Sequence, residues 1–292
     1  MISGRHMGIW WRSFLAAVSM VLLVHAPAGA QRELDEAAAA ARYRTCLALA
    51  DENPQSAYDQ ALDWRDHNSG GRPAEHCAAV ALTRLGSFTE AARRLEILAR
   101  DSEEGMAAQL YGQAGQAWYL AGDMKRAYSN QTKAVDRAPG DPDLLIDRAF
   151  TLVDANDVWR AIDDLTLAAQ LAPGRGDILI YRASAHRLVG SPDLAMTDVE
   201  RGLTLLPNDA NGLLERGILK RMEGDEAGAR ADWLDAIQAD PESEAAEAAR
   251  GNLARMDIGG QGSGIEESGN VGSGGEDSGV GDSEMEGPPL PQ

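Results

Sequence analysis

The chain has 292 residues, of which 44% are hydrophobic and 25% are charged, and its formal net charge is −19 at pH 7. This acidic balance argues against a nucleic-acid partner, because a phosphate backbone would be repelled. The sequence also lacks a Walker loop, a GxSxG or HExxH motif, and a GxGxxG before a strand. We therefore expect a non-enzymatic protein that needs no cofactor and no metal ion.

Residues 1–30 have the three regions of a secretory signal peptide. Two arginines precede an apolar stretch from Phe14 to Val24, and the small-residue motif Ala28-Gly29-Ala30 closes the segment. The apolar stretch is about half as long as the roughly 20 residues that a membrane anchor, the alternative interpretation, would need. We predict cleavage after Ala30, whether translation starts at Met1 or at Met7. The mature protein is then expected in the periplasm, without insertion into the membrane.

The first part of the mature chain predicts two irregular helix pairs. In residues 31–71, a degenerate pair, Pro54 begins the second helix and Gly70-Gly71 ends it. Residues 72–107 predict a further pair, with Gly86 at the turn between its two helices.

Two cysteines, Cys46 and Cys77, lie near the middle of the first helices of these two pairs. Such helices lie side by side in a stack, and an exported chain enters an oxidising compartment, so we favour a structural disulfide. It would close a loop of about 31 residues and stabilise the fold by roughly 3–4 kcal/mol. Buried free thiols and a redox-active or metal-binding pair are the alternatives, and no CxxC spacing supports redox chemistry.

The middle of the chain contains an internal repeat of 34 residues. Its clearest mark is a set of evenly spaced prolines: Pro139, Pro173, Pro207 and Pro241. They divide the chain into four blocks without insertions: 108–141, 142–175, 176–209 and 210–243. Proline lacks the amide proton that a continuing helix needs, so each proline predicts the end of a helix.

Other positions, numbered from the first residue of each block, repeat with the same period. Positions 8, 20 and 27 hold only alanine or glycine: Gly115, Ala149, Ala183, Gly217; Ala127, Ala161, Ala195, Ala229; Ala134, Ala168, Gly202, Ala236. Position 15 holds residues that tolerate a left-handed turn: Gly122, Asn156, Gly190 and Gly224. Each block therefore predicts two helices, at about positions 2–14 and 18–31, whose backbones approach closely at the small residues. One pair cannot bury its apolar face alone, so the pairs must stack.

At these residues the sequence resembles the tetratricopeptide-repeat family. The small residues, the turn Gly or Asn and the closing proline match its pattern over 108–241, although Tyr or Leu replaces the usual Trp at position 4. The resemblance implies an all-α fold, a right-handed α-solenoid of stacked antiparallel helix pairs. It also implies a role in binding other proteins.

In the resembled family, positions 2, 5, 9 and 12 of the first helices line a concave groove. Ten residues form the predicted partner-binding groove here: Gln116, Tyr119, Ile146, Phe150, Val153, Ile180, Arg187, Leu214, Ile218 and Arg221. Family members that bind chaperones use Lys and Asn at positions 5 and 9, and this chain has neither there, so that activity is not expected. A largely apolar stripe favours a helical or extended apolar segment as ligand. The alternatives are that the N-terminal units cover the stripe, that it self-associates, or that it packs between repeats.

The C-terminal part predicts a polar, alanine-rich capping helix at 244–258, as repeat arrays require. Residues 259–292 are rich in Gly and Ser and contain seven acidic residues and no basic ones. Such a composition predicts a disordered tail that solubilises the protein or, alternatively, attracts a basic partner.

We expect a periplasmic interaction scaffold that binds a protein or peptide partner without catalysis. A structural accessory subunit of a cell-envelope assembly complex is the alternative. A redox or metal protein that uses Cys46 and Cys77 is the third hypothesis.

Overall fold

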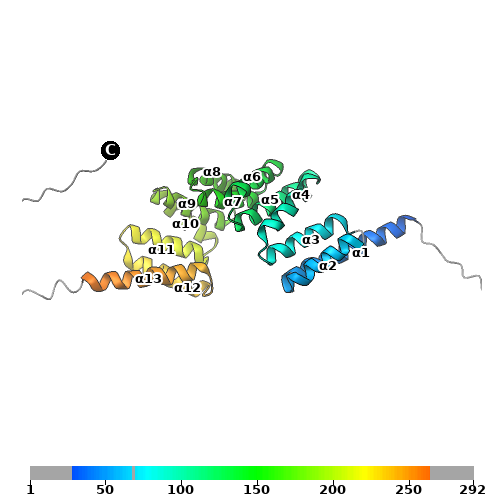
Figure 1. The fold of residues 1–292 in the computed structure, drawn as a ribbon. Coiled ribbons are helices and arrows are strands. Elements are labelled where there is room, and N and C mark those ends of the chain that lie inside the picture. Colours follow the sequence, from blue (N-terminus) through cyan, green and yellow to red (C-terminus); the bar gives the residue numbers. More distant parts are fainter. Residues whose placement is uncertain (1–27, 68–69, 264–292) are drawn as a thin grey trace, which may run out of the picture. The chain divides into compact units, whose positions relative to one another are not determined.

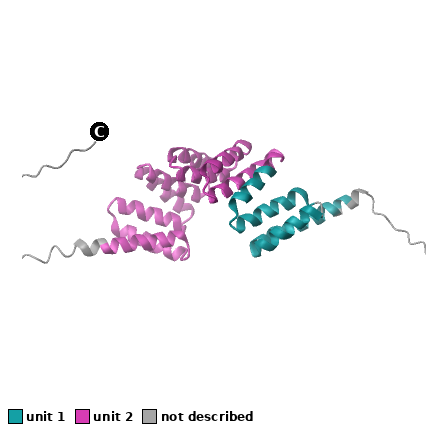
Figure 2. Cartoon of the chain, in the orientation of Figure 1, with its two compact units in different colours: residues 1–98 teal, residues 99–292 magenta. Residues whose placement is uncertain are grey.

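The computed structural model of the chain describes residues 28–67 and 70–263. This part of the chain is helical, without strands, and divides into two compact units, residues 1–98 and 99–292 (Figure 2). Residues 1–27 of the predicted signal peptide and residues 264–292 of the predicted tail lie outside the described residues. None of the described helices combines the length and the apolar character that a bilayer crossing demands.

The first unit contains three helices and most of a fourth (Figure 1): α1 Ala28–Glu52, α2 Pro54–His67, α3 Gly71–Arg84 and α4 Phe88–Arg100. The first three pack against one another in all combinations. Glu75 of α3 accepts hydrogen bonds from Arg65 of α2 at 3.0 Å and from Arg94 of α4 at 2.9 Å. One carboxylate thus ties three helices together.

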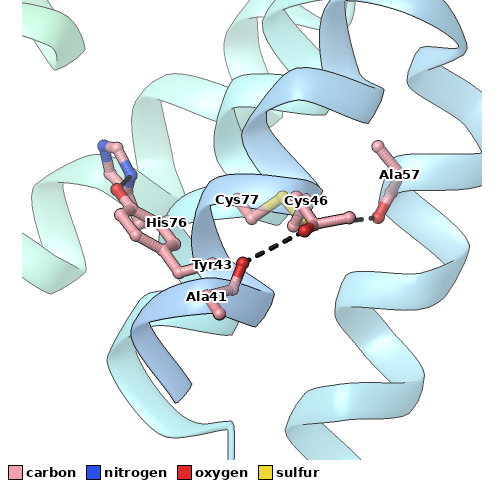
Figure 3. The surroundings of a disulfide bond; sticks show 7 residues. Ala41, Tyr43, Cys46, Ala57, His76 and Cys77 are labelled. Atoms are coloured by element: carbon pink, nitrogen blue, oxygen red, sulfur yellow. Dashed lines mark hydrogen bonds between the residues drawn. A yellow bond between two sulfur atoms is a disulfide. The ribbon is translucent and has the colours of Figure 1, made fainter. Parts of the chain in front are cut away.

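A disulfide between Cys46 and Cys77 joins α1 to α3, with a Cα–Cα distance of 6.2 Å. Both cysteines are buried in a small core that includes Ala61 of α2 and Ala78 of α3. The Cys46 sulfur lies 3.8 Å from the carbonyl oxygen of Ala57 in α2, and Figure 3 shows both residues beside the disulfide. The disulfide therefore lies where the three helices meet.

The second unit is built of helix pairs that repeat every 34 residues. Its helices are α5 Glu104–Leu120, α6 Met124–Arg137, α7 Pro142–Asp154, α8 Val158–Leu171, α9 Gly176–Leu188, α10 Pro192–Leu205, α11 Ala210–Met222, α12 Glu226–Ala239 and α13 Glu244–Ser263. Each first helix packs mainly against the second helix of its own pair, and each pair packs against the next. The described helices form an all-α solenoid within this unit.

The turns inside the pairs confirm the prediction for position 15. Gly122, Asn156, Gly190 and Gly224 have φ between 61° and 87°, the left-handed conformation that ends a helix. The next amide in each case donates to a carbonyl five residues earlier, as Asp123 does to Trp118 at 3.0 Å. These bonds satisfy the carbonyls that a helix end leaves free.

The prolines act as predicted. Each second helix ends just before one, and the residue that precedes the proline lies outside the helical region, with φ of −135° at Ala138, −132° at Ala172 and Leu206, and −148° at Asp240. The proline ring disfavours the helical conformation of its predecessor. The helices of the last three blocks begin one residue earlier than the spacing predicted, and α5 begins four residues before its block, at Glu104. No proline precedes α5 to delay its start.

The alanines and glycines at positions 8, 20 and 27 are all buried, as predicted. Larger side chains pack beside them, and Trp118, Leu152, Leu165 and Trp233 are at most 4% exposed. The last helix, α13, packs against α11 and α12 through Ala245, Ala246, Ala249 and Met256. It extends to Ser263, beyond the predicted end at 258.

Candidate functional site

The candidate site is the face formed by positions 6, 9 and 12 of α5, α7, α9 and α11, which we call the first-helix face. Two residues predicted to line a groove there, Ile146 and Ile180 at position 5, are instead buried, with 6% and 1% of their surface exposed. Ile180 fills the space beside Gly202 and Gly212, where an added Cβ atom would lie 2.8 Å from its side chain. Position 5 thus belongs to the packing between helices.

Position 9 of one repeat contacts position 6 of the next, three times in succession. Gln116 donates to Asp147 at 2.7 Å, from α5 to α7. Phe150 of α7 packs edge-to-face on Tyr181 of α9, with ring centroids 4.9 Å apart. Ser184 of α9 donates to Glu215 of α11 at 3.0 Å. The polar predicted residues of this face therefore hold neighbouring first helices together.

Position 12 is also largely engaged in contacts along the stack. Tyr119 donates to Asp154 of the next first helix at 2.5 Å, and half-buried Arg187 pairs with the buried Glu215 at 2.5 Å. Val153 is half-buried. Arg221 is exposed and pairs with the exposed Glu226 at 3.7 Å. The predicted basic rim is thus available at Arg221, whereas Arg187 is committed to an ion pair.

Phe150 is the most exposed apolar residue among the ten predicted groove residues, with 40% of its surface accessible. Leu214 and Ile218 are partly buried and pack against the core around Trp233. Most other side chains of this face are engaged in contacts between first helices. The exposed aromatic ring is a favourable contact for a partner, because aromatic side chains contribute much of the binding energy at interfaces.

Two carboxylates lie on the same helix as Phe150, Asp147 three residues before it and Asp154 four residues after it. Burial is the main cause that raises the pKa of Asp147 to about 6, against the opposing effect of the Gln116 hydrogen bond. Asp154 is exposed and accepts the Tyr119 hydroxyl, and that hydrogen bond is the main cause of the raised pKa of Tyr119. The acidic setting favours a ligand that combines an apolar side chain with a basic one.

Comparison with known proteins shows which fold these helix pairs form. Neither a protein-family model nor a curated protein sequence matches the chain. Among solved structures, pilF of Pseudomonas aeruginosa is 13% identical with a TM-score of 0.59, over 74% of this chain and 98% of that one. MamA residues 41 to the end from Desulfovibrio magneticus RS-1 is 17% identical with a TM-score of 0.52, over 59% and 97%. The chain folds as a tetratricopeptide-repeat array.

The tetratricopeptide array contains a second periodic feature that the sequence interpretation missed. An arginine at position 7 of the first helix forms a two-pronged ion pair with an aspartate at position 23 of the second helix. The three pairs are Arg148–Asp164, Arg182–Asp198 and Arg216–Asp232, with nitrogen–oxygen distances of 2.6–2.9 Å. The aspartates are 3–8% exposed. The sequence contains a signal for these pairs: an Arg is followed 16 residues later by an Asp in three consecutive tetratricopeptide blocks.

These ion pairs are structural. Buried charges need such paired, hydrogen-bonded geometry to offset their loss of hydration. At Asp232, burial alone would raise the pKa, but the hydrogen bonds from Arg216 and Lys220 lower it below its ordinary value. Within the part of the array that the structure describes, no group of three His, Cys, Asp or Glu side chains is placed to hold a metal ion.

Proposed function

We propose that the protein is a non-catalytic interaction scaffold of the periplasm, which binds a protein or peptide partner on its first-helix face. The observation that carries the proposal is the exposed Phe150 ring, fixed against Tyr181 between two neighbouring repeats. The contacts between first helices hold this ring in place before any ligand arrives, so little conformational freedom is lost on binding.

The charges around Phe150 define the chemistry of the expected partner. Asp147 and Asp154 lie on the same helix as Phe150, at positions 6 and 13, three and four residues away. An apolar side chain of the partner would pack on the aromatic pair, while a lysine or arginine next to it would face these carboxylates. We therefore expect a segment with alternating or helically spaced apolar and basic residues.

The proposed periplasmic location is supported by the signal-peptide pattern of residues 1–30 and by the Cys46–Cys77 disulfide. Disulfides persist in oxidising compartments and are rare in the reducing cytosol. The same disulfide supports a structural use of both cysteines, because they are buried among alanines where three helices meet.

The test places a photo-crosslinking amino acid at Phe150 in the full chain inside cells of the native host. Residue Leu167 on the second helix α8 provides a matched control position, since it is 41% exposed against 40% for Phe150. We expect a discrete crosslinked protein from position 150 that is absent from position 167. That protein is then purified and its affinity for variants is measured by calorimetry.

Phe150→Asp is expected to weaken binding of the captured partner by about tenfold or more, which corresponds to about 1.4 kcal/mol. Leu167→Asp, the same chemical change at equal exposure, is expected to leave the affinity unchanged. Equal loss in both variants, or full binding by Phe150→Asp, would remove the first-helix face as the binding site. Several crosslinked proteins of one large complex would instead favour the accessory-subunit hypothesis.

A further inference from the structure

A cleft of about 350 Å³ lies at the C-terminal end of the array. Its lining residues come later in the chain than the aromatic pair of Phe150 and Tyr181. The cleft is formed between α11, α12 and α13. Its lining residues are Ile218, Arg221, Met222, Trp233, Asn252 and Arg255.

The base of this cleft is apolar. Trp233 is almost fully buried and its indole nitrogen donates to the Leu214 carbonyl at 3.2 Å, so the ring is held in place. Ile218 packs against the same core. Met222 is 57% exposed at the edge of the cleft. A flexible thioether at the border of an apolar pocket adapts readily to a bound side chain.

The rim of the cleft is basic. Arg221 has a carboxylate near it only at 3.7 Å, from the exposed Glu226, and such surface pairs contribute little. Arg255 donates at 2.6 Å to the neutral amide oxygen of Asn252. Among the described residues no carboxylate forms an ion pair with Arg255. Two arginines thus converge on one cleft of a protein whose net charge is −19.

The C-terminal segment of the same chain has the complementary charge. Residues 264–292 contain seven acidic residues and no lysine or arginine. Five of the acids follow at 276–286: Glu276, Asp277, Asp282, Glu284 and Glu286. Met285 supplies a long apolar side chain between the last two of them.

The connection is long enough for these acids to reach the cleft. The segment follows directly on α13, the helix that contributes Asn252 and Arg255 to the lining. From Arg255 to the end of the helix at Ser263 the distance is about 12 Å, at about 1.5 Å per residue. Residues 264–275 span up to about 40 Å when extended, at about 3.3–3.6 Å each. This length exceeds what a return to Arg255 requires.

We propose that the acidic segment 276–286 binds in the cleft of its own chain, with its carboxylates on Arg221 and Arg255 and Met285 against the apolar base. Tethering gives the segment a local concentration in the millimolar range, so weak contacts suffice to keep the cleft occupied. A free acidic peptide would bind only by displacing the segment. The inference does not depend on the partner proposed for Phe150.

The test uses the full chain with Ser283→Cys, which adds one thiol for a nitroxide while Cys46 and Cys77 remain in their disulfide. Methyl resonances of isotopically labelled methionines report which residues lie near the nitroxide. The Met222 signal is expected to lose intensity by about twofold or more, because a tethered segment occupies its site in most molecules. Met124, in the first regular repeat, is the internal reference.

Charge changes in the cleft and in the acidic segment test the assigned contacts. Arg221→Glu with Arg255→Glu is expected to restore the Met222 signal, and so is salt at about 1 M, which screens exposed charges. Arg201→Glu, the same charge reversal at an exposed arginine of α10, is expected to leave the signal weakened. Amide replacement of the five acids from 276 to 286 gives a second route that leaves the folded body unaltered.

The proposal is overturned if Met222 keeps its full intensity, or if the loss persists after amide replacement of the five acids. It is also overturned if the loss arises between molecules. That case is recognised by mixing nitroxide-labelled chain with separate isotope-labelled chain, in which an intramolecular contact produces no effect on Met222.

Discussion

At the scale of single residues, Asp147 makes the stability of the fold depend on pH. Its carboxyl accepts a hydrogen bond from Gln116 at 2.7 Å, yet burial raises its pKa to about 6. In the unfolded chain an aspartate has a pKa of about 3.9. Between these two values the folded state binds more protons than the unfolded state, so the free energy of unfolding falls as the pH rises from about 4 to about 6.

Replacing Asp147 with Asn is therefore expected to stabilise the protein at pH 7.5 by roughly 2 kcal/mol, because the buried charge disappears while an oxygen remains for Gln116. The stability should also fall less steeply between about pH 4 and pH 6. Urea unfolding followed by circular dichroism at several pH values measures both effects. Asp163→Asn, the same change at an exposed position of α8, serves as the control. A variant Asp147→Asn that is less stable at pH 7.5 would contradict the burial argument.

At the scale of helices, the close approach of α11 and α12 depends on a glycine, because any side chain at that position would collide with the neighbouring helix. A Cβ atom added at Gly217 would lie 2.4 Å from the indole nitrogen of Trp233 and 2.6 Å from its Cδ1 atom. The indole is also bonded to the Leu214 carbonyl. The ring therefore cannot move aside without losing that bond and disturbing the core between α11 and α12.

Gly217→Ala is expected to lower the free energy of unfolding by about 1–3 kcal/mol, the usual cost of overpacking a core. Gly174→Ala, in a loop where nothing lies within 4 Å of the added atom, should be neutral or stabilise by up to about 1 kcal/mol. Urea unfolding monitored by tryptophan fluorescence compares the two. Equal effects at both positions would show that α11 and α12 are less closely packed than described.

The helices and turns were predictable because their signals are local. The left-handed turn at Asn156, the helix end before Pro173 and the burial of Ala161 each depend on a few residues within one repeat. The first-helix face was less predictable, because burial there depends on the next repeat: Ile180 is covered by α10 and α11, and Ser184 meets Glu215 only after stacking. The Arg–Asp pairs, such as Arg182 with Asp198, could have been found from their regular spacing.

At the scale of the whole molecule, the disulfide stabilises only one of the two compact units. Cys46 and Cys77 are 31 residues apart and both belong to the unit of residues 1–98. A cross-link of this length reduces the conformational freedom of the unfolded chain. The four regular repeats contain no cysteine and are held by core packing, by the buried Arg–Asp ion pairs and by the contacts between first helices.

The double variant Cys46→Ser with Cys77→Ser is expected to destabilise the first unit by about 3–4 kcal/mol and to leave the second unaffected. Hydrogen exchange should show faster exchange of amides in α1 and α3, with α7–α10 unchanged. In chain isolated from cells under alkylating conditions, neither cysteine should react before reduction. Uniform loss of protection along the chain, or alkylation of the unreduced protein, would contradict this picture.

The contacts between consecutive first helices have one more consequence, which concerns the order of the repeats. The junction of α5 and α7 is made by an amide and a carboxylate, that of α7 and α9 by two aromatic rings, and that of α9 and α11 by a hydroxyl, a guanidinium and a carboxylate. Swapping two blocks would oppose side chains that do not match and would leave the carboxylate of Glu215 without its cation. Although the helices share one geometry, each block is therefore matched to its neighbours, and shuffling the blocks or copying one of them would lose these matched contacts.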